Sequence, residues 1–130
     1  MKLAIGGAAA VLIAGAAFGT SVLPSASLER GRVAFQKCYA CHALEPGKKL
    51  EGPSLHRIVG RRIAAERGFP YSPALKALAK RKARWDPALL DRFIADPEQV
   101  APRTSMNFHG IGDRRERAAL IAYLRRTGRR

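Results

Sequence analysis

Residues 38–42 read C-Y-A-C-H, so two cysteines three residues apart are followed directly by a histidine. Two thiols at this spacing can each form a thioether with one vinyl group of a haem. The imidazole of His42 can then bind the haem iron as its fifth ligand. The pattern therefore predicts one c-type haem, covalently attached through Cys38 and Cys41.

Other uses of the motif are less consistent with the rest of the chain. A thioredoxin-like redox pair belongs to a βαβ unit, which nothing in the sequence predicts. A structural zinc site needs four ligands, and no second Cys or His pair has a suitable spacing. A disulfide between the two cysteines stays open for an exported protein, but it would leave His42 without a role.

An iron that only carries electrons needs a second axial ligand. Met106 is the only methionine besides Met1, and Met/His ligation raises the reduction potential of a haem. His56 and His109 are the alternative ligands, and Met106 could instead be an ordinary core side chain. We expect His42 and Met106 to bind the iron.

Prolines and glycines divide residues 28–130 into helices and long loops. Helices are predicted over residues 28–41, from Pro73 to about Ala79, from Pro87 to Ala95, and from Asp113 to about Arg126. Ser or Asp before a proline marks the second and third starts, and a capping box marks the last.

No window alternates as a strand does, so we predict an all-α domain of about four helices. The loops over residues 42–70 and 97–112 are long for a compact domain and need something to pack against. A haem would provide that surface.

The chain has 130 residues, 47% of them hydrophobic, with 24 basic and 10 acidic side chains and a net charge of +14. This is a globular composition, which excludes a disordered basic tail, and the length excludes a multidomain enzyme. Two cysteines exclude a disulfide scaffold.

Residues 3–23 carry no charge and follow a single Lys2, which is typical of an export signal. The run is also long enough to span a bilayer. We therefore assign residues 1–27 to a signal peptide cleaved after Ser27 or to an uncleaved membrane anchor, and residues 28–130 to the folded domain. Either alternative predicts a periplasmic domain, soluble or tethered to the inner membrane.

Residues 28–130 resemble class I monohaem cytochromes c, in particular the bacterial c2-like branch that is similar to the mitochondrial carrier. Several motifs occur in the family's order: G-x-x-x-F at 31–35, C-x-x-C-H at 38–42, G-P-S-L-H with G-R at 52–61, Y-S-P-A-L at 71–75, Trp85, P-R-T-S-M at 102–106 and L-I-A-Y-L at 120–124. The chain departs from the family at Arg103, where a glycine is usual, and at Val100, where a tyrosine is frequent.

The resemblance implies a role for individual residues. Cys38 and Cys41 would bind the haem vinyl groups, His42 and Met106 the iron, and the Pro53 carbonyl would accept the ring N–H of His42.

Further roles follow for the surroundings of the haem. Tyr71, Trp85 and Thr104 would hydrogen-bond the propionates, which are costly to bury unpaired, and Phe108 would cover the haem edge. The contact between the first and last helices would be made by Gly31, Phe35, Leu120 and Tyr123.

The resemblance also implies a one-electron carrier, a monomer that converts no substrate and works between respiratory or photosynthetic complexes. Its partners would be membrane redox complexes with acidic docking surfaces: quinol–cytochrome c reductase, cytochrome oxidase or a reaction centre. A basic face would speed that encounter, with Lys37, Lys48 and Lys49 as edge contacts, and nucleic acid is not expected. The alternatives are a haem subunit of a larger periplasmic dehydrogenase or oxidase, and a ligand-binding or peroxidatic cytochrome with a labile sixth site.

Overall fold

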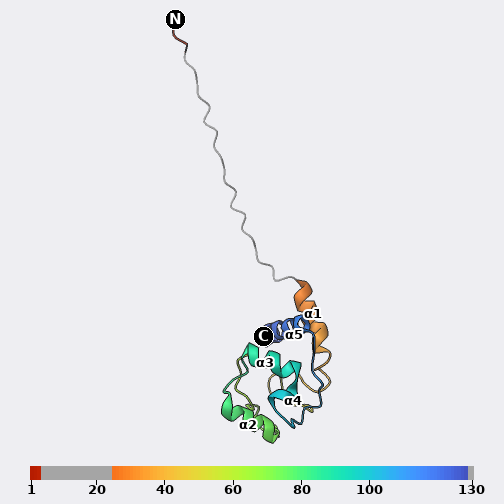
Figure 1. Ribbon diagram of the computed structural model, residues 1–130. Coiled ribbons are helices and arrows are strands. Elements are labelled where there is room, and N and C mark those ends of the chain that lie inside the picture. The colour runs from red at the N-terminus through yellow and green to blue at the C-terminus, as the bar shows by residue number, and fades with distance from the viewer. Residues whose placement is uncertain (4–24, 129–130) are drawn as a thin grey trace.

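The computed structural model describes residues 1–3 and 25–128. These residues form five helices: α1 (Ser25–Phe35), α2 (Pro73–Arg81), α3 (Pro87–Ala95), α4 (Pro97–Val100) and α5 (Arg114–Thr127) (Figure 1). Outside them, the only β pairing in the described part is a single antiparallel bridge between Arg62 and Arg84. The prediction of an all-α domain is therefore confirmed.

The first helix lies earlier than predicted. It begins at Ser25 rather than Leu28 and ends at Phe35 rather than Cys41. After Phe35 the backbone tightens into turns, because Gln36 and the two residues that follow it donate to carbonyls three positions back. A signal-peptide cleavage after Ser27 would fall within the first turn of α1.

Three helices begin at the predicted N-caps, Ser72, Asp86 and Asp113. The Ser72 hydroxyl accepts the N–H of Leu75 at 3.2 Å, and a carboxylate oxygen of Asp86 accepts the N–H of Leu89 at 2.8 Å. Each bond satisfies an N–H that has no partner inside its helix, and a proline at the next position suits the first turn. α2 continues two residues beyond the predicted Ala79, to Arg81.

The short helix α4 was not predicted, since residues 97–112 were expected to form only a loop. Asp96 has two functions there: its backbone N–H donates to the Arg92 carbonyl and ends α3, while its side chain accepts the N–H of Gln99 and begins α4. The same dipeptide, Asp96-Pro97, therefore ends one helix and starts the next.

α1 and α5 cross at one end of the domain, and α2 lies at the other end (Figure 1). Gly31 lies so close to α5 that a Cβ at this position would clash with the Ala119 carbonyl and with Cβ of Tyr123. The rings of Phe35 and Tyr123 are 5.7 Å apart, and Leu120 on α5 is buried in the core. The predicted contact between the first and last helices is confirmed.

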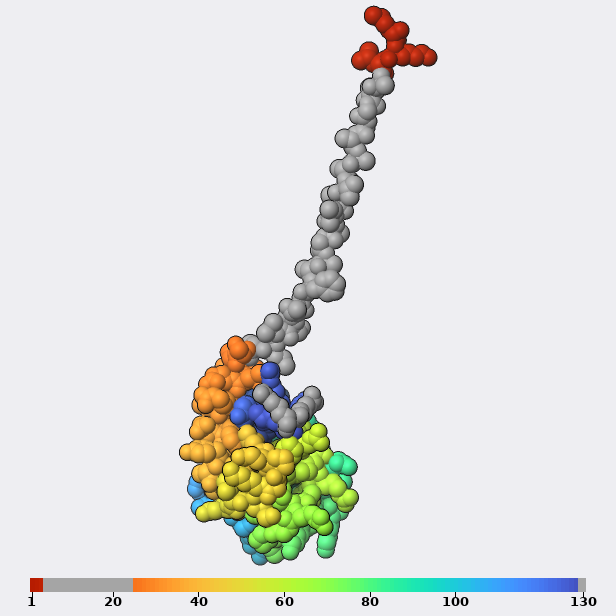
Figure 2. Space-filling model, turned by 180° about the vertical axis from the view of Figure 1, so that it is seen from behind, coloured from red at the N-terminus to blue at the C-terminus, as the bar shows by residue number. Residues whose placement is uncertain are grey.

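Seen from behind, the first long loop lies between α1 and the end of the domain that contains α2 (Figure 2). The main core lies among the helices and includes Leu78, Leu89, Ile111 and Leu124.

The predicted leader or anchor falls mostly on residues 4–24, which lie outside the described residues. Among the described residues, no helix is long and apolar enough to cross a membrane.

Candidate haem site

The C-x-x-C-H motif forms a single turn after α1. The backbone N–H of His42 donates to the Cys38 carbonyl at 2.9 Å, and that of Cys41 donates to the same oxygen at 3.1 Å. Both cysteines are free thiols; Cys38 is partly buried and Cys41 is exposed. Burial raises the pKa of the Cys38 thiol to about 11. The turn thus presents two unpaired thiols and an imidazole within five residues, which is the donor set that a haem c requires.

The His42 ring is fixed by one hydrogen bond. Its Nδ1 lies 2.8 Å from the Pro53 carbonyl oxygen, and since a carbonyl can only accept, Nδ1 carries the proton. Nε2 is therefore the nitrogen with a free lone pair. Burial lowers the pKa of His42, against the opposing effect of the bond to Pro53, so the ring is neutral at pH 7. A neutral imidazole held at one nitrogen is ready to bind a metal at the other.

Gly52 completes this arrangement by packing its backbone directly on the imidazole. A Cβ at this position would overlap the His42 ring, with ring atoms Nδ1 and Nε2 only 2.6 and 2.8 Å away. Real Cβ contacts are never so short, so a larger residue would push the ring off the Pro53 carbonyl.

Met106 lies in the second long loop, after α4. It is partly buried and packs against the main core. The Thr104 hydroxyl oxygen accepts the N–H of Met106 at 3.4 Å, and the Met106 carbonyl accepts the N–H of Phe108 at 3.0 Å. No hydrogen bond joins Met106 to His42, and their pairing across an iron stays a prediction.

Of the predicted propionate-side residues, Tyr71 and Trp85 lie between the first long loop and α3, whereas Thr104 lies in the second long loop, after α4. The Tyr71 hydroxyl accepts the backbone N–H of Glu66 at 3.0 Å, and burial raises the pKa of Tyr71. Trp85 is only 6% exposed and lies 4.9 Å from Phe93, centroid to centroid. Its backbone is tied to residues 60–61 by two hydrogen bonds, Trp85 N–H to the Arg61 carbonyl and Gly60 N–H to the Trp85 carbonyl.

Unpaired polar hydrogens test whether this region suits a haem, whose propionates are anionic acceptors. The Nε of Arg61 is buried and has no hydrogen-bond partner among the described residues. A buried, unpaired guanidinium N–H suits an anionic acceptor, so the region fits a propionate.

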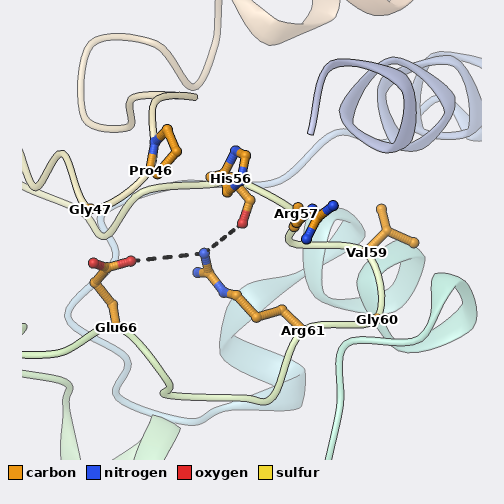
Figure 3. A pocket seen from close by; sticks show the side chains of 8 residues that line it. All are labelled: Pro46, Gly47, His56, Arg57, Val59, Gly60, Arg61 and Glu66. Atoms are coloured by element: carbon orange, nitrogen blue, oxygen red, sulfur yellow. Dashed lines mark hydrogen bonds and ion pairs between the residues drawn. The ribbon is translucent and has the colours of Figure 1, made fainter. Parts of the chain in front are cut away.

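Arg61 and Glu66 are the residues that sequence reasoning missed. Arg61 Nη1 lies 3.9 Å from Glu66 Oε2 and donates to the His56 carbonyl at 2.9 Å (Figure 3). Arg61 belongs to the G-R motif, which was a usable signal. Nothing in the sequence indicated that Glu66 would meet it.

The two predicted alternative ligands lie elsewhere. His109 is exposed, and His56 lines the pocket shown in Figure 3. The predicted docking lysines are partly engaged: Lys37 pairs with Glu116 at 2.5 Å and Lys48 with Glu45 at 3.0 Å.

The model of the cytochrome c family matches residues 28–128. The chain belongs to the cytochrome c family. A cytochrome c2 iso-2 of Magnetospirillum fulvum is 40% identical, with 71% of this chain and 93% of the relative covered. A cytochrome c2 of Rhodomicrobium vannielii is 36% identical, with 95% and 93% covered. Among solved structures, cytochrome cH from Methylobacterium extorquens matches with a TM-score of 0.69 and 37% identity, over 76% of this chain and 97% of that one.

Some relatives are longer than this chain. It spans 55% of a cytochrome c homolog of Bradyrhizobium diazoefficiens, which is 41% identical, and 46% of a cytochrome c-type cyt cy of Rhodobacter capsulatus, which is 39% identical.

Membership of the family settles the cofactor and the general role. This cytochrome c is an electron-transfer protein with covalently bound haem c, and residues 38–42 are its C-x-x-C-H attachment motif. When bound, the haem supplies an iron that takes up and releases one electron.

Proposed function

We propose that this chain is an exported one-electron carrier whose haem iron is bound by His42 and Met106. The hydrogen bond of 2.8 Å between His42 Nδ1 and the Pro53 carbonyl is the observation that carries the proposal, because it directs Nε2 to the metal. A carbonyl that accepts the ring N–H in this way fixes the orientation of the imidazole and makes it a stronger ligand. A single imidazole bound in this way suits an iron that stays ligated in both oxidation states.

Met106 is the sixth ligand in this proposal. It is the only thioether of the chain apart from Met1, and its partial burial against the core favours a fixed position over a mobile surface one. A Met/His pair keeps the iron six-coordinate and raises its reduction potential. Such a site transfers electrons and does not bind small ligands.

Export is supported by residues 3–23, which form an uncharged run behind Lys2. We place the mature domain in the periplasm, soluble after cleavage or tethered if the segment is retained. Its partners there are membrane redox complexes with acidic docking surfaces, such as quinol–cytochrome c reductase and cytochrome oxidase or a reaction centre. The net charge of +14 supports such partners, since opposite charges speed encounter.

The docking centre lies near the attachment turn, where apolar and basic side chains occur together. Tyr39 lies within the C-x-x-C-H motif and is 58% exposed, and Val33 on α1 is 54% exposed. Lys37 lies between them in sequence and is half-exposed despite its ion pair with Glu116. Exposed aromatic and apolar residues ringed by cations are typical of transient protein interfaces.

Absorption spectroscopy of the purified haem protein tests the ligand pair. The ferric protein should be low-spin with the weak red band of a sulfur–iron bond, and carbon monoxide should not shift the ferrous spectrum. Met106→Ala should abolish the red band and admit carbon monoxide, whereas the matched variants His109→Ala and His56→Ala should leave both spectra unchanged.

A high-spin wild-type spectrum, or loss of the red band in His109→Ala alone, would contradict the proposal. Ready carbon monoxide binding by the wild type would instead favour a ligand-binding or peroxidatic cytochrome with a labile sixth site. Partner charge is tested separately, by the association rate with an acidic redox partner, which should fall steeply as salt increases.

A further inference from the structure

Arg61 and Glu66 form the most enclosed ion pair of the described residues. Only 19% and 13% of their side-chain surfaces are exposed, and each of the other ion pairs in this part of the chain has at least one side chain exposed by a third or more. The pair lies in a pocket of about 480 Å³, where the guanidinium of Arg61 lies between the Glu66 carboxylate and the His56 carbonyl (Figure 3).

Glu66 is connected to the haem site through two neighbours. Its backbone N–H donates to the Tyr71 hydroxyl at 3.0 Å, and its carboxylate faces Arg61 at 3.9 Å. Arg61 in turn accepts the backbone N–H of Trp85 through its carbonyl. Glu66 therefore contacts one of the groups proposed to surround the haem propionates, Tyr71, and reaches a second, Trp85, through Arg61.

The charges of Arg61 and Glu66 reach the site and act in opposite directions. Burial has the largest effect on the pKa of Tyr71, and the hydrogen bond from Glu66 N–H has the next largest. Of the two charges, Arg61 lowers this pKa and the Glu66 carboxylate raises it. Tyr71 is one of the groups proposed to surround the haem propionates, so charges that act on Tyr71 would also act on a haem bound beside it.

Charge near an iron changes its reduction potential, because the ferric state carries one more positive charge than the ferrous state. An unopposed Arg61 would favour the ferrous state, and a carboxylate beside it cancels that effect. The Glu66 carboxylate lies 3.9 Å from the Arg61 guanidinium, close enough for the two charges to offset each other.

We propose that Glu66 is a redox-tuning residue of this cytochrome, a fixed negative charge that offsets Arg61 and lowers the reduction potential of the haem. It touches neither thioether nor iron ligand and acts through its neighbours. The inference rests on the proposed binding of the iron by His42.

Replacing Glu66 by glutamine removes the charge with little change of shape. The control is Glu45→Gln, which makes the same change of charge at an exposed carboxylate that pairs with Lys48 and is 62% exposed. Both variants and the wild type are titrated as complete haem proteins at a series of ambient potentials, with the ferrous fraction read from the visible spectrum, at low and at high salt.

Glu66→Gln should raise the ratio of ferrous to ferric protein at a fixed ambient potential by about three- to tenfold, as expected for a charge removed from a site of effective dielectric constant near 20. This shift should persist at high salt, since enclosed charges are poorly screened. Glu45→Gln should change the ratio by less than about twofold, and salt should remove even that change. Glu66→Asp, which restores the charge, should return the ratio towards the wild-type value.

Equal shifts in Glu66→Gln and Glu45→Gln, or no shift in either, would overturn the inference. If glutamine at this position also disturbs the spectrum, the aspartate variant decides, because a shift in Glu66→Asp as large as that in Glu66→Gln would show that charge is not the cause. Failure of the ligand assignment is recognised separately, from the wild-type spectrum.

Discussion

The backbone N–H of Arg103 donates to Oε1 of Glu98 across 2.7 Å, from a residue whose φ is +62°. This left-handed conformation costs about 1–2 kcal/mol for a residue with a side chain. It lies just before Thr104, at the position where the family usually has glycine. The loop that carries Met106 therefore holds a conformation at Arg103 that favours glycine, and it does so against steric strain.

Arg103→Gly should stabilise the protein by about 1 kcal/mol, because glycine adopts a positive φ without steric cost and loses only part of that gain to its more flexible unfolded state. Denaturant unfolding of the haem protein measures the change. The control Arg103→Ala removes the charge and keeps Cβ, and it should give no such gain. If Arg103→Ala stabilised the protein as much as Arg103→Gly, the cause would be the lost charge and not the backbone conformation.

Gly31→Ala should destabilise the domain by about 1–3 kcal/mol, because its Cβ must separate α1 from the Ala119 carbonyl on α5. Gly112→Ala is the matched control, since a Cβ at Gly112 meets nothing within 4 Å and Gly112 has no positive φ. The free energy of unfolding of each variant provides the comparison. A Gly31→Ala protein as stable as Gly112→Ala would mean that the helices separate at no cost.

Gly52→Ala should act on the metal site and not only on stability. The added Cβ displaces the His42 ring from the Pro53 carbonyl, so the ring should lose its preferred orientation. We expect a weaker red band in the ferric spectrum and easier binding of carbon monoxide than in the wild type. Gly112→Ala serves again as control, and an unchanged Gly52→Ala spectrum would show that the ring tolerates the shift.

Asp113 should make stability depend on pH in the acidic range. Hydrogen bonds from the backbone N–H groups of Glu116 and Arg115 lower its pKa below the ordinary value of 3.8. A carboxyl whose pKa is lower in the folded state adds stability above its unfolded pKa, and this contribution disappears as the pH falls through the folded pKa.

Asp113→Asn keeps an acceptor at the N-cap but does not titrate. The Tm of the wild type minus that of Asp113→Asn should therefore be constant above about pH 5 and should fall below about pH 4. Thermal unfolding followed by circular dichroism at several pH values measures it. If this difference in Tm does not change with pH, the charge of Asp113 contributes nothing to the stability of the folded state.

Local signals explain which helix starts were predictable. At Ser72 and Asp86 the capping side chain and the N–H that it accepts are three residues apart, so the sequence contains the whole interaction. Asp96 contains an equally local signal, but it was interpreted only as the end of a helix. A residue that both ends and begins a helix cannot be recognised from a rule for one end alone.

Contacts between distant segments explain what was missed in the site. The thioether cysteines, His42 and Pro53 were predictable, because their motifs lie close together and match the family. Glu66 reaches Arg61 only through the course of a loop that contains no regular element, and that course depends on tertiary packing. The same holds for Glu116, which was expected to complete a capping box and instead accepts a bond from Lys37.

The crossing at Gly31 joins the first helix of the domain to the last. α1 is synthesised about ninety residues before α5, the helix against which it packs most closely. The finished fold thus comes only at the end of translation. A process that needs an open chain can therefore act only before α1 and α5 meet.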